Sequence, residues 1–347
     1  MARILLLLLW IWPALLQAQP IKIGILTDLS GAMASWGRQS RLGAEIARDE
    51  IVKSGGALEL IFGDDQLNAK NAVSEFRKLI EFDQVDTVYC EFTPPTVAVA
   101  PIAKTKQVLM VYSAAAASPL ELSPYLFKSY MNYVDGCRTI GEFWRSQGIK
   151  RAGILRLNFE SGDLCAQGLK QAYPELIESN YNHDDDLVAQ VMLLKSHGVE
   201  AVMNVAFEPD LLRMYQALKR LNWRPLVGTQ NDAVADAAIE RFPGLLEKTT
   251  VFGLPQLSEA FLSKVKAHDP ENTLASISAA GLAYLHIKQL YAAISGCPKK
   301  AVACISEKLS AAPADPEFGF GRWVKRVADF RVSLRTWRAG RAVEQPR

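Results

Sequence analysis

The sequence predicts an α/β protein made of two Rossmann-like, doubly wound lobes that are joined by more than one crossover. Three observations predict this class. The chain has 347 residues, 49% of them hydrophobic and 22% charged, which suits a globular protein with two domains of ordinary size. Short apolar runs alternate with longer segments of helical period, as in parallel sheets covered by helices. The second half of the chain repeats this alternation of apolar runs and helical segments.

The first half of the chain predicts a parallel sheet with helical crossovers. Strands are expected at 21–26, 58–62, 85–89 and 108–112, and helices at 40–54, 68–82 and 95–104. Gly55-Gly56 can close the first helix, because glycine adopts the left-handed conformation of a helix C-cap at little cost. Pro94-Pro95 can open the third helix, because the first helical turn has spare N–H groups.

The second half repeats the pattern. Strands are expected at 153–157, 201–206, 226–228 and 249–254, and helices at 135–147, 162–177, 188–196 and 209–221. The helix over 162–177 runs across Pro174 in this interpretation. The residues from His183 to Asp186 resemble a metal-binding cluster, but they directly precede an apolar helical segment, and an acidic residue at that position caps a helix. No metal site is expected.

The last hundred residues become helical before a final strand. Helices are expected at 258–267, 273–295 and 301–311, and a strand at 330–336. In that strand Phe330, Val332, Leu334 and Thr336 share one face, and the arginines between them share the other. We expect the helices and the tail to complete the first lobe. The predicted division is 19–130 with 255–322 as lobe 1, 131–254 as lobe 2, and 323–347 as a C-terminal strand and basic tail.

The first eighteen residues predict a signal peptide. Arg3 precedes an apolar run over 4–12, and small residues follow up to Ala18, where we place the cleavage. The run is far shorter than the ~20 residues of a spanning helix, although an uncleaved anchor is the alternative. The protein is therefore expected to be exported, to the periplasm.

Export permits disulfides among the five cysteines. Cys297 and Cys304 enclose a short segment and are the best pair. Cys137 and Cys165 could form a second bond, which would leave Cys90 free. Because no CxxC pair is present, neither a redox motif nor a zinc site is expected.

Charge limits the choice of partners. The net charge of +2 lacks the basic excess that nucleic-acid binding needs. Residues 322–347 carry eight Arg or Lys against two acidic residues, so this end could dock an acidic partner or a membrane, or form a solvated face.

Ligands of open α/β sheets bind beyond the carboxyl ends of the strands, so the residues that follow each strand are the candidates. The loop after the first strand has no GxGxxG or P-loop pattern, and no cofactor is expected. Its Trp36 is either a ligand wall or a side chain packed under its own loop. Thr93 opens a helix whose N-terminus favours a carboxylate, and it can also act as the cap. The small residues from Ser113 to Pro119 allow a ligand close to the backbone.

These motifs, in this order and spacing, resemble the type I periplasmic binding proteins, in particular the leucine/isoleucine/valine-binding branch. The quoted residues are Leu29-Ser30-Gly31 with Trp36-Gly37, then Gly63-Asp64-Asp65, then the loop from Tyr112 to Pro119. The resemblance covers about 21–257. It implies two lobes with three crossovers, no enzymatic activity, and a small molecule held in the cleft for a membrane ABC permease. A monomer is expected.

The resemblance also implies a ligand site. Trp36 matches the aromatic residue of the first loop, Thr93 the hydroxyl that meets the ligand carboxylate, and Phe207 an aromatic wall. The loop over 115–117 matches one that offers a carbonyl and a Thr hydroxyl to an ammonium group, but Ala117 lacks the hydroxyl. Glu160 or Ser161 stands where an aromatic residue is expected. The acidic ammonium clamp aligns with Gln230, with Asp232 nearby, so either Asp232 supplies the charge or the ligand has no ammonium group.

The expected cleft residues are Trp36, Thr93, Ser113, Ala115, Phe207, Gln230 and Asp232. On this interpretation, Trp36→Ala and Asp232→Ala weaken ligand binding while the unfolding midpoint stays nearly the same. The leading hypothesis is an importer's binding component for a carboxylate-bearing or amino-acid-like ligand. The alternatives are a periplasmic sensor or accessory protein, linked to quinone-dependent alcohol oxidation as in certain lineages of such proteins, and, more remotely, a hydrolase.

Overall fold

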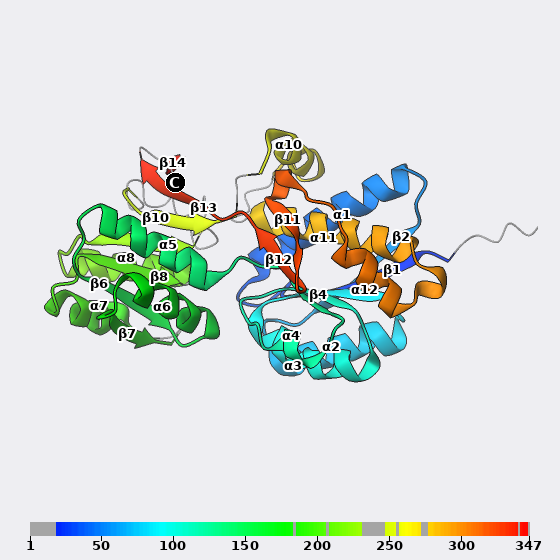
Figure 1. Cartoon of the computed structure of the whole chain (residues 1–347), viewed down its shortest axis with the longest axis horizontal. Helices are drawn as coiled ribbons and strands as arrows, with labels where there is room; N and C mark the ends of the chain where they lie inside the picture. The colour runs from blue at the N-terminus through cyan, green and yellow to red at the C-terminus, as the bar shows by residue number, and fades with distance from the viewer. Residues whose placement is uncertain are drawn as a thin grey trace, which may run out of the picture.

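The computed structural model has two lobes, each built on one sheet (Figure 1). It describes residues 19–182, 185–205, 208–230, 247–254, 257–271, 277–338 and 341–345. The predicted signal peptide therefore lies outside the described residues. Within them, no helix is long and apolar enough to cross a membrane.

Lobe 1 contains a sheet of seven described strands. In spatial order they are β11 (Phe320–Val324), β12 (Val327–Phe330), β5 (Leu126–Lys128), β4 (Met110–Ser113), β3 (Thr87–Glu91), β1 (Ile21–Thr27) and β2 (Leu58–Asp64). All neighbouring strands pair parallel except β11 and β12, which form an antiparallel hairpin. The strand order reverses direction around β1, so the sheet is doubly wound, as predicted.

Helices cover both faces of this sheet. They are α1 (Ala34–Lys53), α2 (Ala69–Arg77) with the π-helical turn η1 (Lys78–Phe82), α3 (Thr93–Lys106), α4 (Pro119–Leu122), α10 (Glu259–His268), α11 (Ile277–Ser295) and α12 (Val302–Ser310), with the short 3₁₀ turns η3 (Pro298–Lys300) and η4 (Pro316–Phe318). The backbones of α1 and α11 touch at Gly43. A Cβ at that position would lie only 1.9 Å from the carbonyl oxygen of Ala280, so a larger residue would force the helices apart. The late helices thus complete lobe 1.

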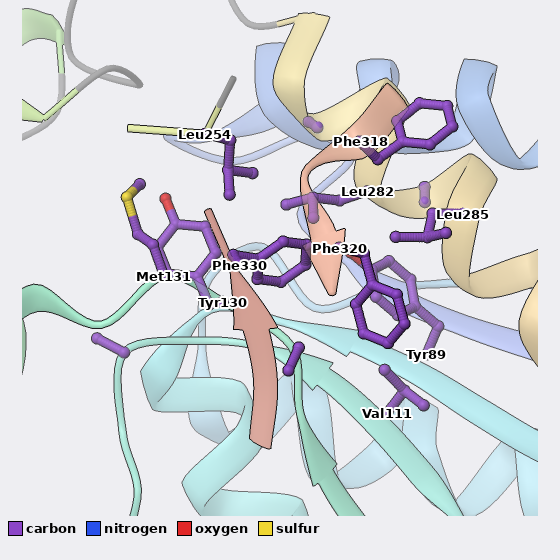
Figure 2. Close-up of a cluster of buried hydrophobic side chains, with 14 of the residues drawn as sticks. Tyr89, Val111, Tyr130, Met131, Leu254, Leu282, Leu285, Phe318, Phe320 and Phe330 are labelled. Atoms are coloured by element: carbon purple, nitrogen blue, oxygen red, sulfur yellow. The ribbon is translucent and has the colours of Figure 1, made fainter. Parts of the chain in front are cut away.

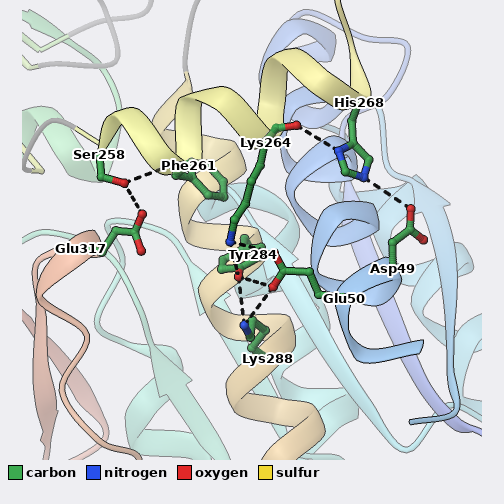
Figure 3. A network of polar contacts seen from close by, with 9 residues as sticks. All are labelled: Asp49, Glu50, Ser258, Phe261, Lys264, His268, Tyr284, Lys288 and Glu317. Carbon is green, nitrogen blue, oxygen red and sulfur yellow. Dashed lines mark hydrogen bonds and ion pairs between the residues drawn. The ribbon is translucent and has the colours of Figure 1, made fainter. Parts of the chain in front are cut away.

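A charged network joins three of these helices (Figure 3). Glu50 of α1 forms ion pairs with Lys264 of α10 at 2.7 Å and Lys288 of α11 at 3.1 Å, and accepts a hydrogen bond from Tyr284 OH at 2.5 Å. Burial opposes ionisation here, but the hydrogen bonds from Lys264, Tyr284 and Lys288 prevail and lower the pKa of Glu50 to about 2. The network fixes α10 and α11 against the first helix.

One core layer of lobe 1 lies between the sheet and α11 (Figure 2), and a second lies between the sheet and helices α2 and α3. Phe320 and Phe330 of the β11–β12 hairpin pack edge-to-face with ring centroids 5.9 Å apart, and Tyr89 and Val111 approach from the central strands. The hairpin is therefore part of this core. Its strands were not predicted, because residues 320–330 alternate only weakly between apolar and polar positions.

Lobe 2 repeats the architecture with a second sheet. Its described strands, in spatial order, are β14 (Arg341–Glu344), β13 (Ser333–Arg338), β10 (Thr250–Gly253), β9 (Leu226–Gln230), β8 (Ala201–Val205), β6 (Ala152–Leu157) and β7 (Ile177–Tyr181). Its helices are α5 (Tyr133–Ser146), α6 (Glu160–Ala172), α7 (Leu187–Ser196) and α8 (Glu208–Arg220). A disulfide joins Cys137 of α5 to Cys165 of α6, and a second joins Cys297 to Cys304 in lobe 1.

Two local predictions in lobe 2 have different outcomes. The helix expected over 162–177 is wrong at its end, because α6 stops at Ala172 and β7 begins at Ile177. Pro174 lacks an N–H and clashes with a preceding carbonyl, so the helix ends before it. Asp186 caps α7 by accepting the N–H of Val188 at 3.2 Å, whereas His183 and Asp184 lie outside the described residues. Among the residues described, no cluster of potential metal ligands is present.

The C-terminal segment corrects the prediction that the tail completes lobe 1. The expected single strand over 330–336 is broken at 331–332, and β13 and β14 pair antiparallel in the sheet of lobe 2. Arg335, expected on the face opposite the apolar residues of this strand, is only 4% exposed and donates to the carbonyl of Leu254 at 2.9 Å. Alternation in sequence cannot specify which sheet a strand joins. Some of the basic residues of this segment therefore belong to strands β13 and β14 of the sheet.

The chain passes between the lobes three times: after β5, after β10 and after β12. The predicted doubly wound lobes with multiple crossovers are therefore confirmed. Such connections let two lobes rotate as rigid bodies about short segments, and a ligand can bind in the gap.

Candidate functional site

A cavity lies between the lobes at the carboxyl ends of their central strands. It is partly open to solvent, and most of its lining is apolar, as in small-molecule sites. Four lining residues are the last of their strands: Ser113 of β4, Leu157 of β6, Val205 of β8 and Gln230 of β9. The full lining is Trp36, Leu67, Phe92, Thr93, Pro94, Ser113, Ala114, Ala115, Tyr130, Tyr133, Leu157, Phe159, Ser161, Val205 and Gln230.

Five of the seven predicted site residues line this cavity. They are Trp36, Thr93, Ser113, Ala115 and Gln230. Phe207 and Asp232 lie outside the described residues. Of the two candidates at the start of α6, Ser161 is in the lining.

Sequence reasoning missed much of the aromatic lining. Phe92 follows β3 directly, so its position after a strand was the available signal. Tyr130 and Tyr133 follow β5, a strand of three residues that is too short to be recognised by periodicity. Phe159 stands next to Glu160, the residue that aligned with an aromatic wall.

Aromatic rings of lobe 1 pack against one another and against Tyr133 of α5. The Trp36 ring is 6.2 Å from Phe92 and 6.5 Å from Tyr130, centroid to centroid, and Tyr130 is 5.9 Å from Tyr133. Such contacts hold large side chains in fixed orientations and present apolar surface to a ligand. Phe159, which is 36% exposed, faces the same cavity from lobe 2.

Trp36 is held by its loop as well as by its neighbours. Trp36 is 6% exposed and lies in the first turns of α1. The next residue, Gly37, lies against the backbone of the loop that follows β1. A Cβ on Gly37 would lie 1.8 Å from the carbonyl oxygen of Asp28, so only glycine fits there. Asp28 in turn accepts the N–H groups of Gly31 and Met33 at 2.5 and 2.7 Å. The turn therefore fixes the start of α1, and with it Trp36.

A buried glutamate lies behind the Trp36 side chain. Glu91, the last residue of β3, is 0% exposed. It accepts hydrogen bonds from Thr27 Oγ1 at 2.6 Å, Ser40 Oγ at 2.7 Å, Trp36 Nε1 at 3.0 Å and Tyr89 OH at 3.1 Å. Burial raises the pKa of Glu91, while these hydrogen bonds work in the opposite direction.

The N-terminus of α3 offers few donors. The second and third residues of the helix, Pro94 and Pro95, have no N–H. The N–H of the fourth residue, Thr96, already bonds to the carbonyl of Phe92 at 3.2 Å. The amide and the hydroxyl of Thr93 are thus the donors of this turn that can reach a ligand. The helix dipole adds a favourable potential for an anion at the same point.

The polar groups that line the cavity are neutral. Thr93, Ser113, Ser161 and Gln230 supply hydroxyl and amide groups, and none of the described lining residues carries a formal charge. Gln230, the last residue of β9, is 3% exposed. Within the described lining, hydrogen bonds rather than ion pairs are available to a ligand.

Asp65, at the turn that follows β2, is a buried carboxylate close to the site. It is 0% exposed and accepts the N–H of Leu67, a lining residue, at 2.8 Å. Burial, together with repulsion from Asp28 and Glu91, raises the pKa of Asp65 from 3.8 to about 7.

This shift predicts a pH-dependent stability. Because the folded pKa lies above the unfolded one, folding favours the protonated form, and the free energy of unfolding should fall as pH rises from about 4 to about 7. Relative to the original chain, we expect Asp65→Asn to be about 4 kcal/mol more favourable at pH 8 than at pH 4, because Asn does not ionise; at pH 4 its amide should destabilise the fold by adding unpaired N–H groups. Urea unfolding at both pH values measures this. Asp329→Asn, at an exposed position, is the control, and an equal effect of Asp65→Asn at both pH values would contradict the prediction.

Comparison with known proteins agrees with this architecture. The sequence profile of the family described as "Periplasmic binding protein" matches residues 20–338. A comparison with curated protein sequences gives no match.

Several solved structures share the fold. A leucine-binding protein LivK from Thermotoga maritima is 16% identical with a TM-score of 0.83, covering 94% of this chain and 98% of its own. The branched-chain amino acid binding protein LivJ from Streptococcus pneumoniae, solved with isoleucine, is 18% identical with a TM-score of 0.83, covering 94% and 100%. A possible leucine/isoleucine/valine-binding protein from Rhodopirellula baltica is 20% identical with a TM-score of 0.83, covering 95% and 97%.

The family profile spans nearly the whole chain, and the two lobes enclose a cavity at their strand ends as the fold requires. The chain belongs to the periplasmic binding protein family.

Proposed function

We propose that this chain is the periplasmic solute-binding component of an ABC importer and that its lobes close on a small ligand bearing a carboxylate. The observation that carries the proposal is the cavity itself, which both lobes line and into which the first turn of α3 presents Thr93. Aromatic walls with a few neutral hydrogen-bonding groups suit binding. We propose a monomer that acts as a binding protein without turnover and delivers its ligand to a membrane permease.

The neutral lining bears on the chemistry of the ligand. A buried ammonium group without an anionic partner is costly, and the described lining supplies no carboxylate. We therefore propose a carboxylate without an obligatory ammonium group, and Asp232 remains the candidate that would accommodate an amino acid. Mass spectrometry of small molecules released from the purified, denatured protein tests this directly. Release of a neutral or purely cationic molecule would contradict the carboxylate proposal.

The role of Thr93 can be tested on the released molecule. Thr93→Val removes the hydroxyl but keeps the shape, and we expect the Kd to rise about tenfold because a hydrogen bond to a charged acceptor is lost. The control is Thr105→Val near the other end of α3, where the hydroxyl bonds only to the carbonyl of Pro101 within the helix. Titration calorimetry measures both. A Kd that Thr93→Val leaves unchanged would place the carboxylate elsewhere in the cleft.

A further inference from the structure

The hydrogen bonds of Glu91 connect parts of lobe 1 that are far apart in sequence. Its donors come from the end of β1, the first turns of α1 and β3 itself, and three of the four bond to the same oxygen, Oε1. A buried carboxylate accepting several short hydrogen bonds is a strong and directional anchor. The carboxylate does not line the cavity, so any effect on a ligand must pass through a neighbour.

Trp36 is the neighbour that meets the cavity. Its only N–H group donates to Glu91 Oε1 at 3.0 Å, which leaves the ring surface, and not a hydrogen bond, for a ligand. The bond fixes the rotation of the indole about its Cβ–Cγ bond. Ser40, one turn further along α1, donates to the same oxygen at 2.7 Å, so the helix and the indole are positioned together.

The residue that follows Glu91 supports the same role. Phe92 has φ 64° and ψ 150°, a conformation that side chains other than glycine rarely adopt. It places the Phe92 ring 6.2 Å from that of Trp36, on the cavity wall, and its N–H bonds to the carbonyl of Ser113 at 3.0 Å. Such strain persists where neighbouring contacts determine the backbone strongly, and the buried anchor at Glu91 is one such contact.

We propose that Glu91 is a positioning residue for the ligand site: through the indole N–H it sets the orientation of Trp36, and through the turn at Phe92 it sets the adjoining wall. The proposal rests on the proposed function for its ligand, but its structural step can be tested without one. Both oxygens of Glu91 serve as acceptors, because Oε1 accepts from three donors and Oε2 accepts from Thr27, whereas an amide has one acceptor oxygen.

The first experiment follows the indole N–H of Trp36 by NMR in the full folded protein, with ¹⁵N-labelled tryptophan. The sequence has seven tryptophans, and the resonance is assigned as the one missing in Trp36→Phe. In the original chain we expect slow exchange with solvent. Glu91→Gln should shift this proton resonance and speed its exchange about tenfold, because the amide keeps one acceptor oxygen for donors that now bond to two.

The matched control is Glu45→Gln, which removes a charge from α1 at a site that forms an ion pair with Arg41. It should leave the Trp36 resonance in place. Fast exchange of the indole N–H in the original chain, or an unchanged resonance in Glu91→Gln, would overturn the proposal. Because the first of these results comes from the unsubstituted chain, the test does not depend on whether Glu91→Gln folds.

The second experiment measures affinity, with benzoate and L-isoleucine as separate probes. For a probe that binds the original chain, we expect Glu91→Gln to raise the Kd about tenfold and to have no further effect in the Trp36→Phe background. Equal losses in both backgrounds would show that Glu91 does not act through Trp36. If neither probe binds, the same comparison is made with the molecule released from the purified protein, and the NMR result decides the role of Glu91.

Discussion

Trp36→Ala is expected to weaken ligand binding by at least about 100-fold, the largest single effect on affinity in this protein. The side chain forms an apolar wall of the cavity and packs against Phe92 and Tyr130, and buried aromatic residues of this kind carry much of the energy of a binding site. Calorimetric titration with the molecule released from the purified protein measures the change.

The same substitution should also lower the free energy of unfolding, by about 3 kcal/mol. This revises the expectation from sequence that the unfolding midpoint would stay nearly constant. Trp36 is only 6% exposed, and its loss leaves a void and removes one donor from Glu91. The loop position was consistent with either a ligand wall or a packed side chain; in the structure Trp36 lines the cavity and also packs against Phe92 and Tyr130.

A matched variant separates the two effects. Trp223→Ala removes a half-buried tryptophan that packs against the core of lobe 2, away from the cavity. It should lose stability without a change in Kd. If Trp36→Ala keeps its affinity, or if Trp223→Ala loses as much affinity as Trp36→Ala, then Trp36 does not form the ligand site.

Loss of the disulfide between α5 and α6 is expected to cost about 3.5 kcal/mol of stability, because the bond closes a long loop that the unfolded chain would otherwise leave open. Cys137 and Cys165 are 28 residues apart and both are fully buried. The bond between Cys297 and Cys304 closes a loop of 7 and should contribute less, about 2.4 kcal/mol. Denaturant unfolding of the two double alanine variants measures this order.

Cys90→Ala is the control for the removal of sulfur alone, since Cys90 is buried and free. Its effect should be about 1 kcal/mol. A Cys137→Ala/Cys165→Ala variant that unfolds at the same denaturant concentration as Cys90→Ala would contradict the assigned contribution of the disulfide.

Local patterns gave correct predictions where a single element carries its own signal. The apolar runs of β1, β3 and β4 are buried on both faces, as strands of a parallel sheet are, and they were located within one or two residues. The start of α1 was placed six residues late, because the Gly-rich loop over 31–37 conceals it, although Gly37 is needed inside the helix for its contact with Asp28.

Pairing between distant segments was the part that sequence did not reveal. The alternation over 330–336 concealed a crossing between lobes, and Arg335 is buried because its guanidinium reaches the carbonyl of Leu254. A Glu at a strand end carries no sign that a tryptophan 55 residues earlier will donate to it. Both features depend on contacts across the sheet, which have no period along the chain.

By itself, the sequence determined the two-lobed α/β class and placed Trp36, Thr93, Ser113, Ala115 and Gln230 at or after the ends of strands, since hydrophobic period and helix breakers are local properties. The tertiary structure alone decided which sheet receives the C-terminal strands and that Glu91 lies behind Trp36. The physical reason is that burial and hydrogen bonding depend on which surfaces meet in the folded chain, and residues far apart in sequence contribute to each of those surfaces.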